Sequence, residues 1–108
     1  MSAVVVDTHA IVWYFLKSGN LSATAFLAID RAESVYVASI SVVEIIYLQE
    51  KGKLPEVALQ RLIQALADVN TGWLMMPLSM EIAQAIAQIP RDVVPDMPDR
   101  IITATAFY

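Results

Sequence analysis

The sequence contains no cysteine and a single histidine, His9. Without thiols the chain can form neither a disulfide nor a thiolate metal site, and one imidazole is too few for the usual zinc site. No apolar run approaches the ~20 residues that a membrane-spanning helix requires, and the longest candidate, residues 10–16, ends at Lys17. The N-terminus lacks the features of a signal peptide. These absences favour a cytoplasmic protein that does not span a membrane.

Positive charge is also scarce, because seven Lys and Arg stand against eleven Asp and Glu, for a net charge of −4. This balance argues against a nucleic-acid partner, since phosphates are bound mainly by Lys and Arg. Bound cations would neutralise several of the acids, however, and a substrate would then meet a less acidic surface. The bulk charge is therefore weak evidence about the partner.

Apolar residues, in contrast, are abundant at 57% of the chain, with a mean hydropathy of +0.57. A chain of 108 residues has room for one domain, so we expect a single domain over residues 1–108. The apolar share is enough for a full core. It also predicts apolar surface that a partner would cover.

Strand-like and helix-like segments alternate along the chain. Short apolar or β-branched runs predict strands at residues 4–6, 35–38 and 73–76. Helices are expected between and after them, at about residues 8–17, 22–33, 41–51, 55–69, 79–89 and 98–107. Possible helix-capping residues are Thr8, Ser22, Ser41 and Ser79. The alternation indicates an α/β fold with a parallel sheet and helical crossovers.

Three acids lie directly after a predicted strand or in the first turn of a predicted helix. Asp7 comes directly after the first strand, Glu44 falls in the first turn of the helix after the second strand, and Asp99 falls in the first turn of the last helix. Sites in open parallel sheets form outside the carboxyl ends of the strands, so we expect these acids at one edge, with Asp96 as a further candidate. Clustered carboxylates repel by about 1–4 kcal/mol per pair at ~4 Å. They therefore require a cation, and oxygen ligands suit Mg²⁺ or Mn²⁺.

Each of these acids also has a simpler structural explanation. Asp7 could cap the first helix, and Glu44 could form a capping box with Ser41. Asp96 is favoured as the N-cap of the last helix, where Asp99 would also suit the helix dipole. The joint occurrence of the three acids shifts the weight toward a metal site.

The segments around these acids resemble the motifs of PIN-domain ribonucleases. They are residues 5–13, residues 39–45 with 51–54, and residues 96–106. The likeness covers nearly the whole chain in the right order and is closest to the VapC-type toxins of bacterial toxin–antitoxin pairs. It implies a three-layer α/β fold in which Asp7, Glu44 and Asp99 bind the metal and carry catalysis, and Thr8 supports the metal-bound water.

The resemblance also implies an activity and partners. The expected activity is that of an endoribonuclease that uses Mg²⁺ or Mn²⁺ to hydrolyse RNA, leaving 5′-phosphate and 3′-hydroxyl ends. The expected partners are a second copy of the chain, in a homodimer, and a cognate antitoxin that keeps the toxin inactive. Arg100, Lys51 and Lys53 are candidate contacts with RNA or antitoxin, although Arg100 could instead form a salt bridge and the lysines could be solvated helix-end charges.

The family usually continues into another strand and a motif with a fourth Asp, and we find no counterpart of these before Tyr108. We therefore expect a sheet without that C-terminal strand, and weak activity in the 108-residue form. The alternative function is a shortened, catalytically inactive PIN remnant that dimerises or binds antitoxin. A Ser–His–Asp triad with His9 is less favoured. A phospho-receiver domain is also less favoured, since a receiver would place two adjacent acids after the first strand, where only Asp7 stands.

Overall fold

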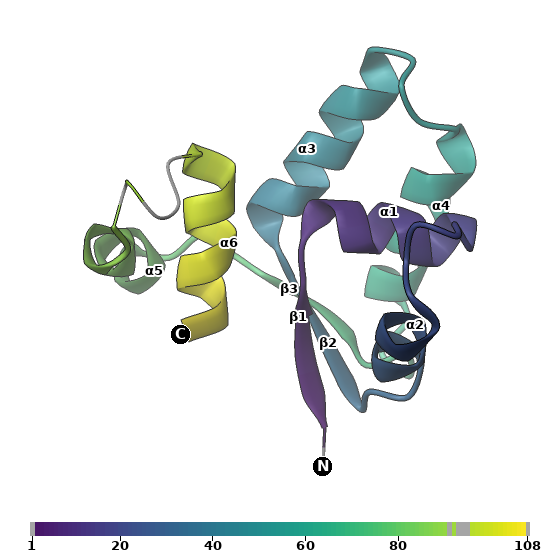
Figure 1. The fold of residues 1–108 in the computed structure, drawn as a ribbon, viewed down its shortest axis with the longest axis horizontal. Coiled ribbons are helices and arrows are strands. Elements are labelled where there is room, and N and C mark those ends of the chain that lie inside the picture. The colour runs from purple at the N-terminus through teal and green to yellow at the C-terminus, as the bar shows by residue number, and fades with distance from the viewer. Residues whose placement is uncertain (1, 91, 93–95, 108) are drawn as a thin grey trace.

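Three parallel strands form the centre of the fold in the computed structural model, which describes residues 2–90, 92 and 96–107. They are β1 (Ala3–Val6), β2 (Ser34–Ala38) and β3 (Trp73–Met76). The sheet order is β1-β2-β3 (Figure 1), and Tyr36 of β2 aligns with Val5 on one side and Leu74 on the other. The predicted α/β class and parallel sheet are confirmed.

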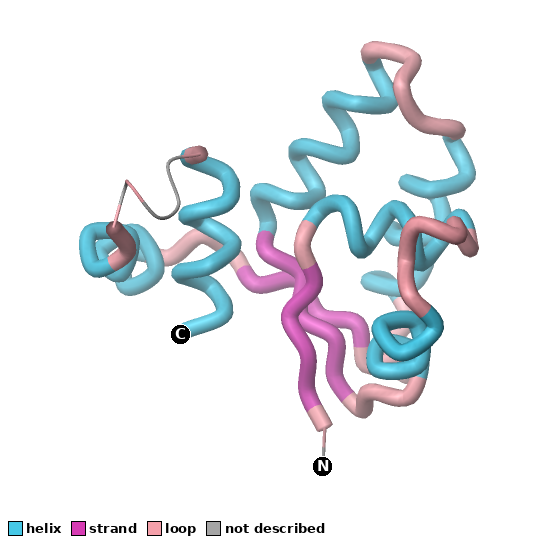
Figure 2. Tube along the Cα trace, in the orientation of Figure 1, coloured by secondary structure: helices cyan, strands magenta, loops and turns pink. Residues whose placement is uncertain are grey.

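Helices connect and cover the strands, as Figure 2 shows. They are α1 (Thr8–Leu16), α2 (Ala23–Asp30), α3 (Ser39–Glu50), α4 (Glu56–Ala67), α5 (Met80–Ala85), the short 3₁₀ helix η1 (Ile86–Gln88) and α6 (Met97–Phe107). Of the proline-containing loop predicted over residues 90–98, residues 91 and 93–95 lie outside the described residues. Within the described part of the chain, no helix is long and apolar enough to cross a membrane.

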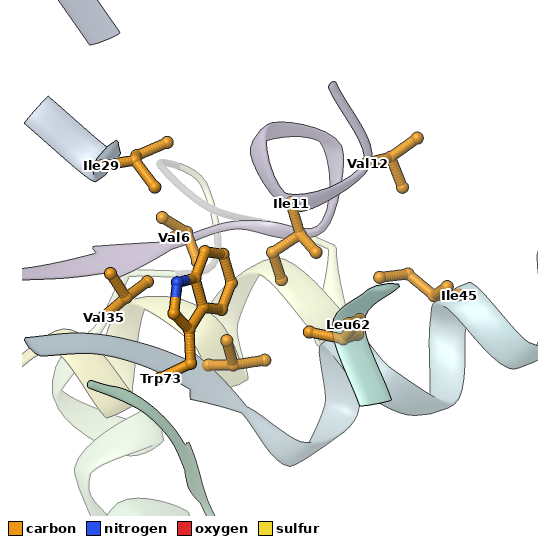
Figure 3. Close-up of a cluster of buried hydrophobic side chains, with 9 residues drawn as sticks. Val6, Ile11, Val12, Ile29, Val35, Ile45, Leu62 and Trp73 are labelled. Atoms are coloured by element: carbon orange, nitrogen blue, oxygen red, sulfur yellow. The ribbon is translucent and has the colours of Figure 1, made fainter. Parts of the chain in front are cut away.

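Helices lie on both sides of the sheet (Figure 1), in the three layers that the sequence predicts. The main core lies on the side of α1 to α4, because alternate strand residues point there and meet apolar side chains of the helices. Its buried members include Val6, Val35 and Trp73 from the strands and Ile11 and Leu62 from the helices (Figure 3). A second, smaller cluster lies between α5 and α6 and consists of Ile82, Ile89 and Ala104.

Gly72 allows the third strand to come close to the second. Its φ of +77° lies in the left-handed region, and a Cβ atom there would come within 2.2 Å of the Glu33 carbonyl oxygen. The Gly72 carbonyl also accepts a hydrogen bond of 2.8 Å from the Val35 N–H. Glycine therefore satisfies both the backbone conformation and the close approach.

The start of α3 differs from the prediction. We expected Ser41 to cap this helix, but α3 begins at Ser39, and Ala38 at the cap position makes no side-chain capping hydrogen bond. The strand β2 ends at Ala38, so β2 leads into α3 without a loop that would hold a capping side chain. As a result, Ser41 lies inside the helix, and Glu44 is its sixth residue rather than part of its first turn.

The structure also settles two other helix starts. Of the two caps considered for α1, Asp7 is the N-cap and Thr8 is the first helical residue, and Pro55 precedes α4 instead of lying in its first turn, as we expected. Ser22 and Ser79 cap α2 and α5 as predicted, through side-chain oxygens that accept from Ala25 and Ile82 N–H groups.

Candidate functional site

The candidate site lies at the carboxyl edge of the sheet, where β1 leads into α1 and β2 leads into α3. The first turns of these two helices lie side by side above the sheet (Figure 1), and α1 packs against α3. Two side chains that are 36 positions apart in the sequence, Thr8 and Glu44, are in direct contact there. The parallel topology thus brings the first two predicted motifs together.

Asp7 has the capping role that we considered as its simpler explanation. Its Oδ1 accepts a hydrogen bond of 2.8 Å from the Ala10 N–H, and its side chain is exposed. This bond occupies one carboxylate oxygen and leaves Oδ2 for another ligand. Capping and metal binding are therefore compatible at this residue, and the helix N-terminus favours its negative charge.

Thr8 and Glu44 form the central contact of the site. The Thr8 hydroxyl donates to Glu44 Oε1 at 2.7 Å, and Thr8 Oγ1 lies 3.1 Å from Ser41 Oγ. Thr8 is 6% exposed and Ser41 is fully buried, whereas Glu44 is half-buried. The sequence analysis missed Ser41 as a site residue, because its spacing from Glu44 matched a capping box.

Asp99 is separate from this contact. It is an exposed residue in the first turn of α6, and its N–H donates to Asp96 Oδ2 at 3.2 Å, so Asp96 is the N-cap that we favoured. Although α6 packs against α3 and β2, no three or more His, Cys, Asp or Glu side chains are grouped closely enough to hold a metal ion among the described residues. The structure brings Thr8 and Glu44 together beside Asp7, and Asp7, Glu44 and Asp99 do not form a metal-holding group of three among the described residues.

The cationic candidates make contacts within the chain. Arg100 donates from Nη2 to the carbonyl oxygens of Ile86 and Ile89 at 2.8 and 3.0 Å. Lys51 Nζ lies 4.8 Å above the Tyr47 ring, and Lys53 is exposed. Their predicted contacts with RNA or antitoxin stay predictions.

The donor chemistry of the site fits a hard divalent cation. Asp7 and Glu44 offer carboxylate oxygens, and Thr8 adds a hydroxyl. Glu44 uses Oε1 for Thr8 and Asp7 uses Oδ1 for the helix, which leaves the second oxygen of each carboxylate. An all-oxygen donor set with spare carboxylate oxygens suits Mg²⁺ or Mn²⁺ rather than a soft metal.

Comparisons with known proteins agree with this reading of the fold. The model of the PIN domain family matches residues 4–108. The chain is 32% identical over 108 residues to Ribonuclease VapC22 of Mycobacterium tuberculosis (strain ATCC 25618 / H37Rv). The matched region covers 98% of this chain and 80% of that protein. It also resembles in fold a chain of a toxin–antitoxin complex from Klebsiella pneumoniae, with a TM-score of 0.65 and 21% identity over 98% of this chain and 78% of the other.

Proposed function

This chain belongs to the PIN-domain family, and we propose that it is a metal-dependent endoribonuclease that acts as the toxin of a toxin–antitoxin pair. The contact between Thr8 and Glu44 carries the proposal, because it joins two of the predicted motifs at the strand ends next to Asp7. The similarity to Ribonuclease VapC22 supports the nuclease activity.

In this proposal Asp7, Glu44 and Asp99 hold Mg²⁺ or Mn²⁺. Such a cation, when bound, lowers the pKa of a water molecule and stabilises negative charge on a phosphoryl group. Asp7 contributes from the fixed start of α1, and Glu44 contributes the oxygen that Thr8 does not engage. The proposal further requires that the three carboxylates come closer together when the ion binds, since they form no group of three among the described residues.

The proposed partners are RNA as substrate, a cognate antitoxin, and a second copy of the chain. The antitoxin is supported by the fold similarity to a chain of a toxin–antitoxin complex. The proposed location is the cytoplasm, where RNA is available.

A second candidate function is a catalytically inactive PIN domain that binds antitoxin or another copy of itself. One observation favours it: no three acids are grouped closely enough to hold a metal ion among the residues that the structure describes. The two candidates differ in whether the chain binds a divalent cation and cleaves RNA.

Calorimetric titration with Mn²⁺ separates the two candidates. We expect the wild-type chain to bind Mn²⁺, and we expect Glu44→Gln and Asp99→Asn each to weaken binding about tenfold or more, since each removes a charged ligand. Glu50→Gln is the matched control, because Glu50 is an exposed acid on the same helix and its loss should leave the affinity unchanged. Equal affinity in all variants would remove these acids from the site.

A cleavage assay on total cellular RNA tests the activity itself. We expect Mg²⁺ or Mn²⁺ to support cleavage, which should be weak in the 108-residue form, and we expect EDTA and Glu44→Gln each to abolish it. Cleavage that persists in EDTA would contradict the metal mechanism. Mn²⁺ binding and RNA cleavage both absent from the wild-type chain would favour the inactive domain.

A further inference from the structure

We propose that Ser41 is a positioning residue of the metal site, and that its hydroxyl acts through Thr8 to hold the Glu44 carboxylate in one orientation. The inference rests on the proposed function, and it gives a role in the metal site to a residue that the sequence analysis considered only as a helix cap. We use the term hydroxyl relay for the hydrogen-bonded series formed by the Ser41 hydroxyl, the Thr8 hydroxyl and the Glu44 carboxylate.

The geometry of the relay is set by two helices. Ser41 and Glu44 are three residues apart on α3, so they lie on the same face of that helix. Thr8 is the first residue of α1 and reaches both, with oxygen–oxygen distances of 3.1 Å to Ser41 Oγ and 2.7 Å to Glu44 Oε1. The relay therefore connects the ends of β1 and β2 through side chains.

The number of available protons decides which group donates at each hydrogen bond of the relay. The Thr8 hydroxyl has one proton, and the carboxylate of Glu44 is both the nearer and the charged acceptor, which makes it the stronger one. The proton between Thr8 and Ser41 must then come from Ser41. Ser41 is fully buried, and among the described residues its hydroxyl has no other hydrogen-bond partner. Donation to Thr8 Oγ1 thus satisfies a hydroxyl that water cannot reach.

The relay has a consequence for metal binding. A glutamate side chain has several rotamers, and fixing it when a ligand binds costs conformational entropy. With Oε1 already held by Thr8 and Thr8 held by Ser41, the Glu44 carboxylate is oriented in advance, with Oε2 left for the cation. Residues that orient metal ligands in this way typically change metal affinity 10–100-fold when they are removed.

The test is a set of Mn²⁺ affinities measured by calorimetry on the 108-residue chain. We expect Ser41→Ala and Thr8→Val each to weaken binding about tenfold. Thr8→Ser keeps the hydroxyl, so it should bind nearly as tightly as the wild type. Because Ser41 acts through Thr8, the double variant Ser41→Ala/Thr8→Val should bind no more weakly than Thr8→Val alone.

Thr105→Val is the matched control for the loss of a buried hydroxyl. Thr105 is 5% exposed, and its hydroxyl donates to the Ile101 carbonyl at 2.8 Å on α6, with no acid involved. A purely structural effect would lower the melting temperature and leave the Mn²⁺ affinity unchanged, which is the result expected for Thr105→Val. If Ser41→Ala does not melt cooperatively, Ser41→Cys replaces it, since a thiol is similar in size and only a weak donor.

The outcomes separate this inference from the proposed function. If the wild type binds Mn²⁺ and Ser41→Ala binds equally tightly, the relay is overturned while the metal site stands. Additive losses in the double variant would also overturn the relay, because they would mean that Ser41 acts independently of Thr8. If the wild type does not bind Mn²⁺ at all, the metal site fails and the relay fails with it.

Discussion

At the scale of single residues, Tyr14 combines an aromatic contact surface with one polar contact. Its ring stacks on Phe26 at a centroid distance of 5.1 Å and lies 5.5 Å from Trp73. Its hydroxyl donates to Asp30 Oδ1 at 2.8 Å. Burial raises the pKa of Tyr14 to about 12, and the hydrogen bond to Asp30 and the negative charge of Asp30 act in the same direction.

This shift predicts a loss of stability at alkaline pH. An unfolded tyrosine releases its proton near pH 10, whereas folded Tyr14 keeps it until about pH 12. The stability that depends on this proton is complete below about pH 10 and is lost as the pH rises toward 12. We expect the free energy of unfolding, measured with urea, to fall less between about pH 9 and pH 11 in Tyr14→Phe than in the wild type.

Tyr47→Phe is the control for this comparison, because Tyr47 is a largely exposed tyrosine, at 59%. It should follow the wild-type pH dependence. If Tyr14→Phe does so as well, the Tyr14 proton does not contribute to stability in this interval.

At the candidate site, the cap of α1 and the contacts of Thr8 could not be predicted from the sequence. Asp7 and Thr8 are neighbours, and both types are good helix caps, so the sequence alone did not decide which of them caps α1. Packing decides it, because Thr8 is buried against Ser41 and Glu44 while Asp7 remains exposed. The hydroxyl contacts of Thr8 depend on a residue pair more than 30 positions away, and no local pattern records them.

At the scale of elements, the strands were predicted most closely. The segment Trp73–Met76 was predicted to the residue and the other two strands within one residue, because short apolar runs between turns leave few alternatives. The start of α3 was wrong by two residues because Ala38 offers no capping side chain. The position of Asp99 relative to the other acids could not be predicted, since it depends on how α6 packs against α3 and β2.

Arg100 connects α6 with η1 by hydrogen bonds, in the helical layer formed by α5, η1 and α6. Its guanidinium donates to the Ile86 carbonyl at the start of η1 and to the Ile89 carbonyl just after η1, next to the cluster of Ile82, Ile89 and Ala104. This bonding does not match the salt bridge considered for Arg100 from the sequence. A charged donor on two carbonyl oxygens holds α6 against η1 more firmly than one apolar contact would.

We predict that Arg100→Lys loosens this layer selectively. A lysine ammonium sits on an unbranched stem and does not place a donor at the position of Nη2, and the loss of both hydrogen bonds should cost about 1–2 kcal/mol of stability. Amide hydrogen exchange should become faster in α5, η1 and α6 and stay unchanged in α1 and α4. Arg31→Lys, at an exposed position after α2, is the control. Uniformly faster exchange in all helices would show that Arg100 acts on the whole fold rather than on one layer.

At the scale of the whole molecule, apolar surface on α3 supports the proposed homodimer. Val43, Ile46 and Tyr47 are 58%, 39% and 59% exposed, and their spacing of three and four residues places them on one face of the helix. The aromatic residues Trp13 and Tyr14 of the neighbouring helix α1 are, in contrast, half-buried in the monomer. The exposed face of α3 is therefore the better candidate for the contact between copies.

The last prediction follows from this face. We expect the chain to sediment as a dimer at micromolar concentration, and we expect Val43→Glu and Tyr47→Glu each to shift it to monomer, because an unpaired charge at the centre of an apolar interface is strongly unfavourable. Val69→Glu is the control, since Val69 is an apolar residue that is 92% exposed outside α3. All three changes add the same charge, so a general effect of charge would shift the three variants equally. Dissociation confined to the α3 variants would locate the interface, and a monomeric wild type would contradict the proposed homodimer.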